Sequence, residues 1–278
     1  MAIIVNTNVS ALKTQNNLTM ATNSLSKALE RLSTGLKINS AADDAAGYFI
    51  AAKLSTQISG SKVANSNVAT GLNVLQMAEG TLDVVEDNIT RIRDLAVQAA
   101  NGVYDTDSLT AMQNEVTARI AEITRVQSAA DFNGIKLFDA TAGLGKDGLT
   151  LQVGANAAAA ENQIKIDKAS FAAVTLTADV SSAAGATAAI TACDTALKTI
   201  ATRKAEMGAV QNRLGSAQEA LMTTIENASA ALSTIMDADI AEETSNYTKA
   251  QILQQTSSTL LIQANNLPSI CLLYTSDA

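Results

Sequence analysis

Residues 18–36, LTMATNSLSKALERLSTGL, decide the fold, because their leucines recur at helical spacing. The steps of seven, four, three and four form the heptad pattern of a coiled-coil seam, carried by Leu18, Leu25, Leu29, Leu32 and Leu36. Gly35 predicts the end of this helix. The seam is diluted by Asn, Ser and Thr, so we expect a helix that is marginal alone and needs a partner.

Working outward, the same period predicts four more helices. Ser40-Ala-Ala-Asp43 has the pattern of a capping box, so a second helix should begin there and end at Asn101-Gly102. A third helix should begin after Asp105 or Asp107 and end before Asn133-Gly134. Helical period resumes near Ile190 and persists to Ile235, with 181–189 as a surface connection, and a last helix runs from 241 towards Pro268.

Between these helices the pattern changes to alternation. Residues 149–156 and 162–167 alternate apolar and polar side chains, which predicts short strands paired as hairpins within a β-rich segment of about 135–185. The fold class we expect is mainly α: an elongated helical bundle or coiled coil of N- and C-terminal helices with a small central β-hairpin region. Two arrangements remain open: the terminal helices pair within one molecule, or they become ordered only when many molecules assemble.

Composition excludes several classes of function. The 278-residue chain is 47% hydrophobic and has one Pro and no His, which removes Ser-His-Asp triads, Cys-His dyads and His-ligated zinc. Its net charge of -8 argues against nucleic acid as a partner. No apolar run is long enough to insert into a membrane. The two cysteines, Cys193 and Cys271, lie in unlike contexts, so they indicate neither a metal site nor a disulfide.

Paired carboxylates are the nearest thing to a catalytic motif. Asp43 with Asp44, and Asp237 with Asp239, have no positioned partner in the sequence, and helix capping accounts for them more simply. We therefore predict no catalytic, cofactor-binding or metal site. A soluble enzyme, as the contrasting class, would need a convergent polar site.

Longer blocks of sequence resemble a known family. Residues 3–47, IIVNTNVSALKTQNNLTMATNSLSKALERLSTGLKINSAADDAAG, resemble the start of bacterial flagellin. RIRDLAVQAANG (91–102), DFNGIKLF (131–138), LQVGAN (151–156), MGAVQNRL (207–214), DADIAEETSNYTKAQILQQ (237–255) and QANNLPSI (263–270) resemble later flagellin blocks in the family's order. The resemblance covers nearly the whole chain except its variable centre.

The resemblance implies a structural subunit that self-assembles into the extracellular flagellar filament for motility, after export in an unfolded state by the flagellar type III apparatus. It implies an inner terminal coiled-coil domain of residues 1–43 and 236–278 and a helical shell domain of residues 44–235. The implied partners are other copies of the chain, the flagellar cap and junction proteins, an export chaperone and the host Toll-like receptor that senses flagellin. The nearest alternative is the hook–filament junction protein, which shares a similar terminal plan.

The resemblance also assigns residues. For filament packing we predict an inner set, Leu25, Leu29, Leu32, Leu36, Ile252, Leu253, Leu260 and Leu261, and a shell set, Leu82, Val85, Ile89, Ile92, Val210, Leu214 and Leu221. Arg91, Leu95 and Glu115 fall on the family's receptor-contact positions; contacts between subunits in the filament are the stronger explanation for them, and both roles can hold together. The last eight residues, CLLYTSDA, depart from the family's apolar ending, and we expect this tail not to be authentic.

Overall fold

The structure is a computed structural model that describes the backbone of residues 7–276 and the side chains of residues 7–158 and 160–266. The helices are α1 (Val9–Thr34), α2 (Ala45–Ala99), α3 (Thr106–Ala129), α4 (Leu144–Asp147), α5 (Ala159–Asn162), α6 (Ala183–Met236) and α7 (Ile240–Ser276), with a 3-10 turn η1 at Lys168–Phe171. The strands are β1 (Asp131–Phe132), β2 (Ile135–Lys136), β3 (Leu149–Gln152) and β4 (Gln163–Ile166). The mainly α fold class is confirmed. The questioned tail, 271–278, lies outside the described side chains.

The chain divides into two compact units. The terminal unit contains the described residues up to Thr56 and from Asn227 onward, and the central unit contains Gln57–Glu226. The division into filament domains at residues 43/44 and 235/236 stays a prediction.

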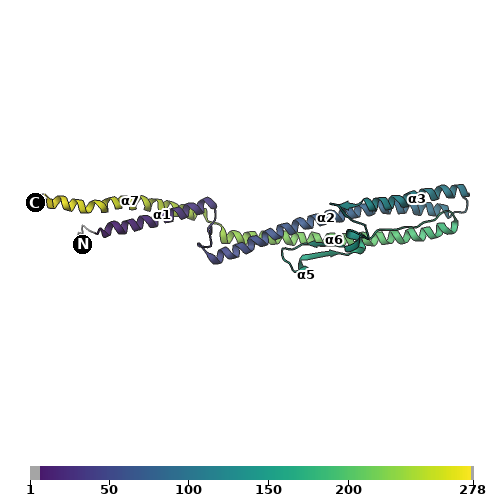
Figure 1. Ribbon diagram of the computed structural model, residues 1–278, viewed down its shortest axis with the longest axis horizontal. Coiled ribbons are helices and arrows are strands. Elements are labelled where there is room, and N and C mark those ends of the chain that lie inside the picture. The colour runs from purple at the N-terminus through teal and green to yellow at the C-terminus, as the bar shows by residue number, and fades with distance from the viewer. Residues whose placement is uncertain (1–6, 277–278) are drawn as a thin grey trace. The chain divides into compact units, whose positions relative to one another are not determined.

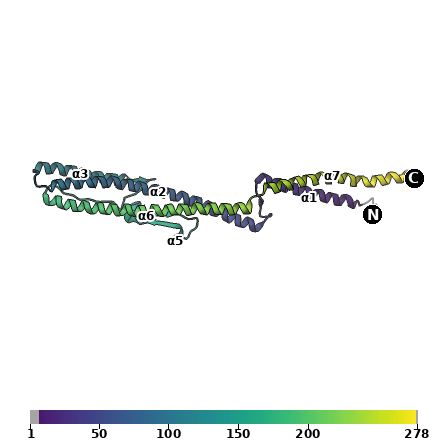
Figure 2. The same cartoon turned by 180° about the vertical axis from the view of Figure 1, so that it is seen from behind.

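In the terminal unit, α1 and α7 lie side by side and run in opposite directions (Figures 1 and 2). The amide of Asn8 donates to the carbonyl of Ala264 at 2.7 Å, and Nη1 of Arg31 donates to Oε1 of Glu243 at 2.8 Å. The start of α1 therefore faces the later part of α7, and the end of α1 faces the start of α7. Of the two arrangements that the sequence left open, the structure has the pairing within one molecule.

Local signals fix the ends of α1 and α2. Gly35 closes α1 with φ 71°, and its N–H donates to the carbonyl of Arg31 at 2.8 Å, as predicted. The prediction that residues 40–43 form the capping box of α2 was wrong. The Asp43 carboxylate accepts hydrogen bonds from the N–H groups of Asn39 and Ser40, so residues 40–43 form a turn before the helix. Asp44 caps α2 instead, accepting the N–H groups of Ala46 and Gly47 at 3.0 Å each.

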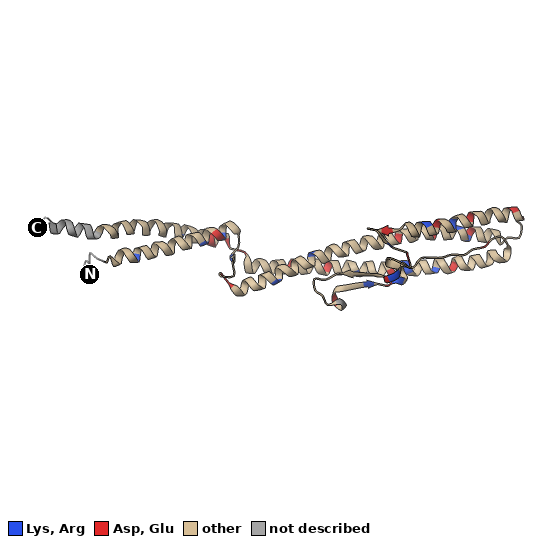
Figure 3. Ribbon diagram, in the orientation of Figure 1, with Lys and Arg blue, Asp and Glu red and all other residues tan. Residues whose placement is uncertain are grey.

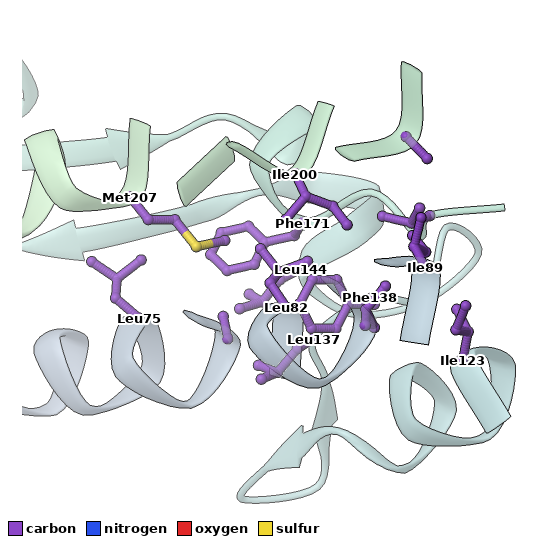
Figure 4. Close-up of a cluster of buried hydrophobic side chains, with 14 of the residues drawn as sticks. Leu75, Leu82, Ile89, Ile123, Leu137, Phe138, Leu144, Phe171, Ile200 and Met207 are labelled. Carbon is purple, nitrogen blue, oxygen red and sulfur yellow. The ribbon is translucent and has the colours of Figure 1, made fainter. Parts of the chain in front are cut away.

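The central unit is built on α2, α3 and α6 around one apolar core (Figure 4). The small elements between α3 and α6 complete this core. Its members labelled in Figure 4 are Leu75, Leu82, Ile89, Ile123, Leu137, Phe138, Leu144, Phe171, Ile200 and Met207. The large side chains buried at helical period on α2 and α6 explain why these two helices are long and continuous.

Two short hairpins lie in the central unit. In β3–β4, Leu149 pairs with Ile166 and Gln152 with Gln163, close to the predicted strands. A side chain at Gly71 of α2 would collide with Leu151, so this glycine lets the hairpin approach the helix. The hairpin β1–β2 was missed. Its turn is Asn133-Gly134, with φ 51° and 80°, a left-handed pair that the sequence interpretation used only as a helix-end signal.

Residues 172–180, which we call the strap, form neither helix nor strand, although they fall in the predicted β-rich segment. Two glutamines of α3 hold them. Gln127 accepts the N–H of Val174 at 2.7 Å and donates to its carbonyl at 3.0 Å. Gln113 accepts the N–H of Val180 at 2.7 Å and donates to the carbonyl of Ala178 at 3.4 Å. Side-chain amides thus take the place of a neighbouring strand for the backbone of the strap.

The prediction that 181–189 is a surface connection was wrong, because α6 begins at Ala183. The hydroxyl of Ser182 accepts the N–H of Gly185 at 3.2 Å, which caps the first turn. Ala186 and Ala189 are buried against the core. These contacts rest on small side chains, which a pattern of large apolar residues does not reveal.

Candidate functional site

The paired carboxylates serve turns and helix ends. Oδ1 of Asp239 accepts the N–H of Ala241 at 2.8 Å at the start of α7, and Asp237 accepts the hydroxyl of Ser233 at 2.6 Å. Among the side chains that the structure describes, no group of three or more His, Cys, Asp or Glu residues could hold a metal ion. Burial raises the pKa of Cys193 to about 11, so its thiol is not a nucleophile at neutral pH. No described helix has both the length and the apolarity of a membrane span.

The surface of the terminal unit offers a different kind of site, which begins with the seam between α1 and α7. On α7 the buried positions are Glu243, Ala250, Ser257 and Ala264, one heptad apart, and on α1 they are Ala21 and Ala28. Because these side chains are mostly short, the two helices pack closely. Several of the larger apolar side chains of both helices are therefore left outside the seam.

One ion pair lies within this seam. Arg31 Nη1 and Glu243 Oε1 are 2.8 Å apart, and the two side chains are 23% and 9% exposed. Nε of Arg31 is buried without a hydrogen-bond partner. A charge pair that is so nearly desolvated contributes little net stability, but it disfavours other registers, because sliding the helices would leave each charge alone.

The large apolar side chains left out of the seam form what we call the exposed apolar set. Leu29 is 55% exposed, Ile252 58% and Leu260 50%, and the other members on α1 and α7 are Val9, Leu12, Met20, Ile240, Leu253 and Ile262. From Ala250 to Ser276 the sequence has no charged residue, and charged residues are sparse along the coloured parts of both helices in Figure 3. A surface with so much exposed apolar area and so little charge is typical of an interaction site.

The predicted inner packing residues divide between seam and surface. Leu25, Leu32, Leu36 and Leu261 are half-buried, whereas Leu29, Ile252, Leu253 and Leu260 are exposed and free to contact another molecule. The predicted shell set lies in the core of the central unit instead. Leu82, Val85, Ile89, Ile92, Leu214 and Leu221 are buried and Val210 is packed against them. Any part that the shell set has in packing between subunits is therefore indirect.

The three residues predicted to contact a receptor lie on or near one surface of the central unit. Nε of Arg91 and Oε1 of Glu115 are 3.0 Å apart, and Arg119 contacts the same oxygen at 3.3 Å. Arg91 lowers the pKa of Glu115 by hydrogen bonding, so this carboxylate is ionised at neutral pH. Leu95 is 3% exposed and belongs to the core. The structure brings Arg91 and Glu115 together at the surface and places Leu95 beneath it.

One cluster was missed by the sequence interpretation. Tyr48, Phe49 and Ile50, at the start of α2, are 43%, 72% and 49% exposed. A signal was present, because three consecutive large apolar residues in a helix point in three directions and cannot all face one core.

Two family comparisons bear on what this surface does. Residues 5–142 match the bacterial flagellin N-terminal helical region, and residues 190–274 match the bacterial flagellin C-terminal helical region. The chain belongs to the bacterial flagellin family. Its flagellin relative from Halalkalibacterium halodurans is 36% identical over 272 residues, which are 97% of this chain and 98% of that protein. The flagellar filament 33 kDa core protein of Treponema phagedenis is 35% identical over 277 residues, 95% of this chain and 96% of that protein.

The family also has a structural counterpart. A putative flagellar hook-associated protein from Vibrio parahaemolyticus superimposes with a TM-score of 0.58, covering 70% of this chain and all of that one. Because its sequence is only 17% identical, this similarity shows a shared fold and nothing about function. Membership of the flagellin family supports a structural role in a flagellar filament, and the hook–filament junction alternative is not favoured.

Proposed function

We propose that this flagellin is a structural subunit that self-assembles into the extracellular filament of a bacterial flagellum, and that it is not an enzyme. The observation that carries the proposal is that buried and exposed positions of the terminal unit have side chains of different size. Small side chains such as Ala28 and Ala250 hold α1 against α7, whereas large ones such as Leu29 and Ile252 are left exposed. Identical neighbours would bury the exposed apolar set, which supplies the driving force for polymerisation.

Electron microscopy of the concentrated protein after addition of ammonium sulfate tests this proposal, because sulfate strengthens apolar burial. Long helical filaments are expected. The test includes a variant whose residues 271–278 are replaced by an apolar ending, because these residues depart from the family pattern. Persistent monomers from both proteins would count decisively against the proposal.

We further propose export in an unfolded state through the flagellar type III apparatus, with a chaperone, and capture by the cap and junction proteins. Support comes from the scarcity of residues that cause slow folding steps. It has one Pro, and Cys193 is a free thiol. Few slow isomerisation or disulfide steps therefore follow passage through a narrow channel. Cells lacking the export apparatus should retain the protein, and its release by such cells would refute this route.

Recognition by the host Toll-like receptor is the remaining part of the proposal. Arg91 and Glu115 would supply the polar contact at the surface, with Leu95 supporting α2 from beneath. Arg91→Ala should weaken receptor activation without loss of helix content, and Leu95→Ala should act through lower stability of the central unit. Unchanged activation by Arg91→Ala would exclude this contact.

A further inference from the structure

The cluster Tyr48, Phe49 and Ile50 contains a largely exposed aromatic ring. Phe49 is 72% exposed, although the chain has only four Phe, and the other apolar residues of this turn cannot shield it because they point elsewhere. Phe side chains have a large free energy to gain from burial. Lys53 follows Phe49 by four residues, so it lies on the same side of α2, and it is exposed.

The terminal unit also contains a hollow of about 280 Å³. Its walls are mostly apolar and come from Leu36, Tyr48, Ala51, Ala52, Leu232 and Met236. Asp237 also lines it, and one of its carboxylate oxygens accepts the hydroxyl of Ser233. Neither Asp237 nor Lys53 makes an ion pair with any residue that the structure describes. An apolar cavity of about 150 Å³ is enough to hold benzene, so the hollow is large enough for a phenyl ring.

The two features complement each other but cannot meet within one subunit. Successive residues of a helix are about 100° apart, so Phe49 points away from the side of α2 on which Tyr48, Ala51 and Ala52 line the hollow. The occupant must therefore come from another molecule. A second copy offers an aromatic ring for the apolar walls, and Lys53 beside that ring matches the carboxylate of Asp237 in charge.

We propose that Phe49 of one subunit inserts into the Leu36–Leu232–Met236 hollow of a second copy, with Lys53 facing Asp237. The Phe49 side chain and the hollow are different surfaces of the same unit, so the contact is heterologous. A row of subunits joined in this way has an unoccupied hollow at one end and an unburied Phe49 at the other. The contact repeats from copy to copy. The inference rests on the proposed function, since it names one contact by which the filament subunits associate.

Photo-cross-linking tests the contact directly. A benzoylphenylalanine is placed at position 49 of the full chain, and equal amounts of ¹⁴N- and ¹⁵N-labelled protein are mixed, polymerised with ammonium sulfate and irradiated. Cross-links to peptides containing Leu36, Leu232 or Met236, with one light and one heavy partner, are expected. The control places the same probe at Val103, which is 76% exposed in the central unit and should not label these peptides.

The outcomes separate the inference from the function on which it rests. Filaments with cross-links only to other peptides, or only within one molecule, would overturn the contact and leave the filament proposal intact. Absence of filaments from the unmodified chain would instead remove the proposed function.

Substitutions give a second, independent measurement. Phe49→Ala should raise the critical concentration for polymerisation about tenfold, because the ring's burial is lost, with unchanged circular dichroism. Lys53→Glu should also raise it, and Lys53→Glu combined with Asp237→Lys should restore it in part, whereas Val103→Ala should not alter it. Equal critical concentrations for Phe49→Ala and the unmodified chain would refute the inserted ring.

Discussion

Gln127 gives the sharpest prediction for the central unit, because a single side chain satisfies both backbone groups of a buried residue. It bonds the N–H and the carbonyl of Val174, which is 7% exposed, and is itself 5% exposed. Gln127→Met keeps the length of the side chain and removes both bonds. A buried polar group left unpaired costs about 1–3 kcal/mol, so two of them, less the gain from an apolar thioether, should cost about 3 kcal/mol.

Gln113 is the matched control, since it holds the strap four turns earlier on α3 but is only half-buried. Water can replace its amide, so Gln113→Met should lower the free energy of unfolding by only about 1 kcal/mol. Urea unfolding followed by circular dichroism measures both values. Hydrogen exchange adds a local measurement: the N–H of Val174 should lose its protection in Gln127→Met, and that of Val180 in Gln113→Met.

The reasoning would be refuted by either of two results. A cost below about 1 kcal/mol for Gln127→Met would mean that the backbone of Val174 finds other partners or water. Full protection of the Val174 N–H in that variant would show that the strap is held by its apolar side chains alone.

Three further predictions concern the terminal unit. Leu29→Asp should raise the critical concentration for polymerisation about a hundredfold, because a carboxylate would have to be desolvated, while helix content stays unchanged; loss of helix would contradict this. Arg31→Met should lower the free energy of unfolding by about 3 kcal/mol by leaving Glu243 without its partner, and Arg31→Met with Glu243→Met should recover most of it. The Lys27 ammonium and backbone N–H groups lower the pKa of Asp43 from 3.8 to about 2, so its stabilising contribution is complete above pH 4 and is lost as the pH falls towards 2. The difference in melting temperature between the unmodified chain and Asp43→Asn should therefore shrink over that interval, and a difference that is constant from pH 5 to 2 would exclude this role.

Sequence reasoning succeeded where a structure depends on neighbouring residues. Gly35 ends α1 and Asp105 caps α3, because a left-handed residue and a capping carboxylate act within a few positions. The same reasoning misplaced the start of α2. Asp43 and Asp44 both fit a cap, and the choice depends on Lys27, which reaches Asp43 from another element.

Contacts between distant elements account for what the sequence could not predict. Gln127 and Val174 are 47 residues apart, and no pattern in either segment indicates that a side-chain amide will pair with that backbone. Leu29 is likewise exposed because Ala21 and Ala28, and not Leu29, are buried against α7. Both alanine and leucine recur at heptad spacing in α1, so the sequence alone does not tell which of them faces the partner helix.

The uncharged stretch of α7 has a consequence for the speed of association. Each subunit carries a net charge of -8, so two subunits repel each other at long range, and residues 250–276 bring no opposite charge to guide their approach. Added salt shortens the Debye length to about 8 Å at physiological ionic strength, which weakens this repulsion, whereas apolar contacts are not screened. Filament growth should therefore become faster as salt is added from low ionic strength, the opposite of the slowing seen when charged partners attract.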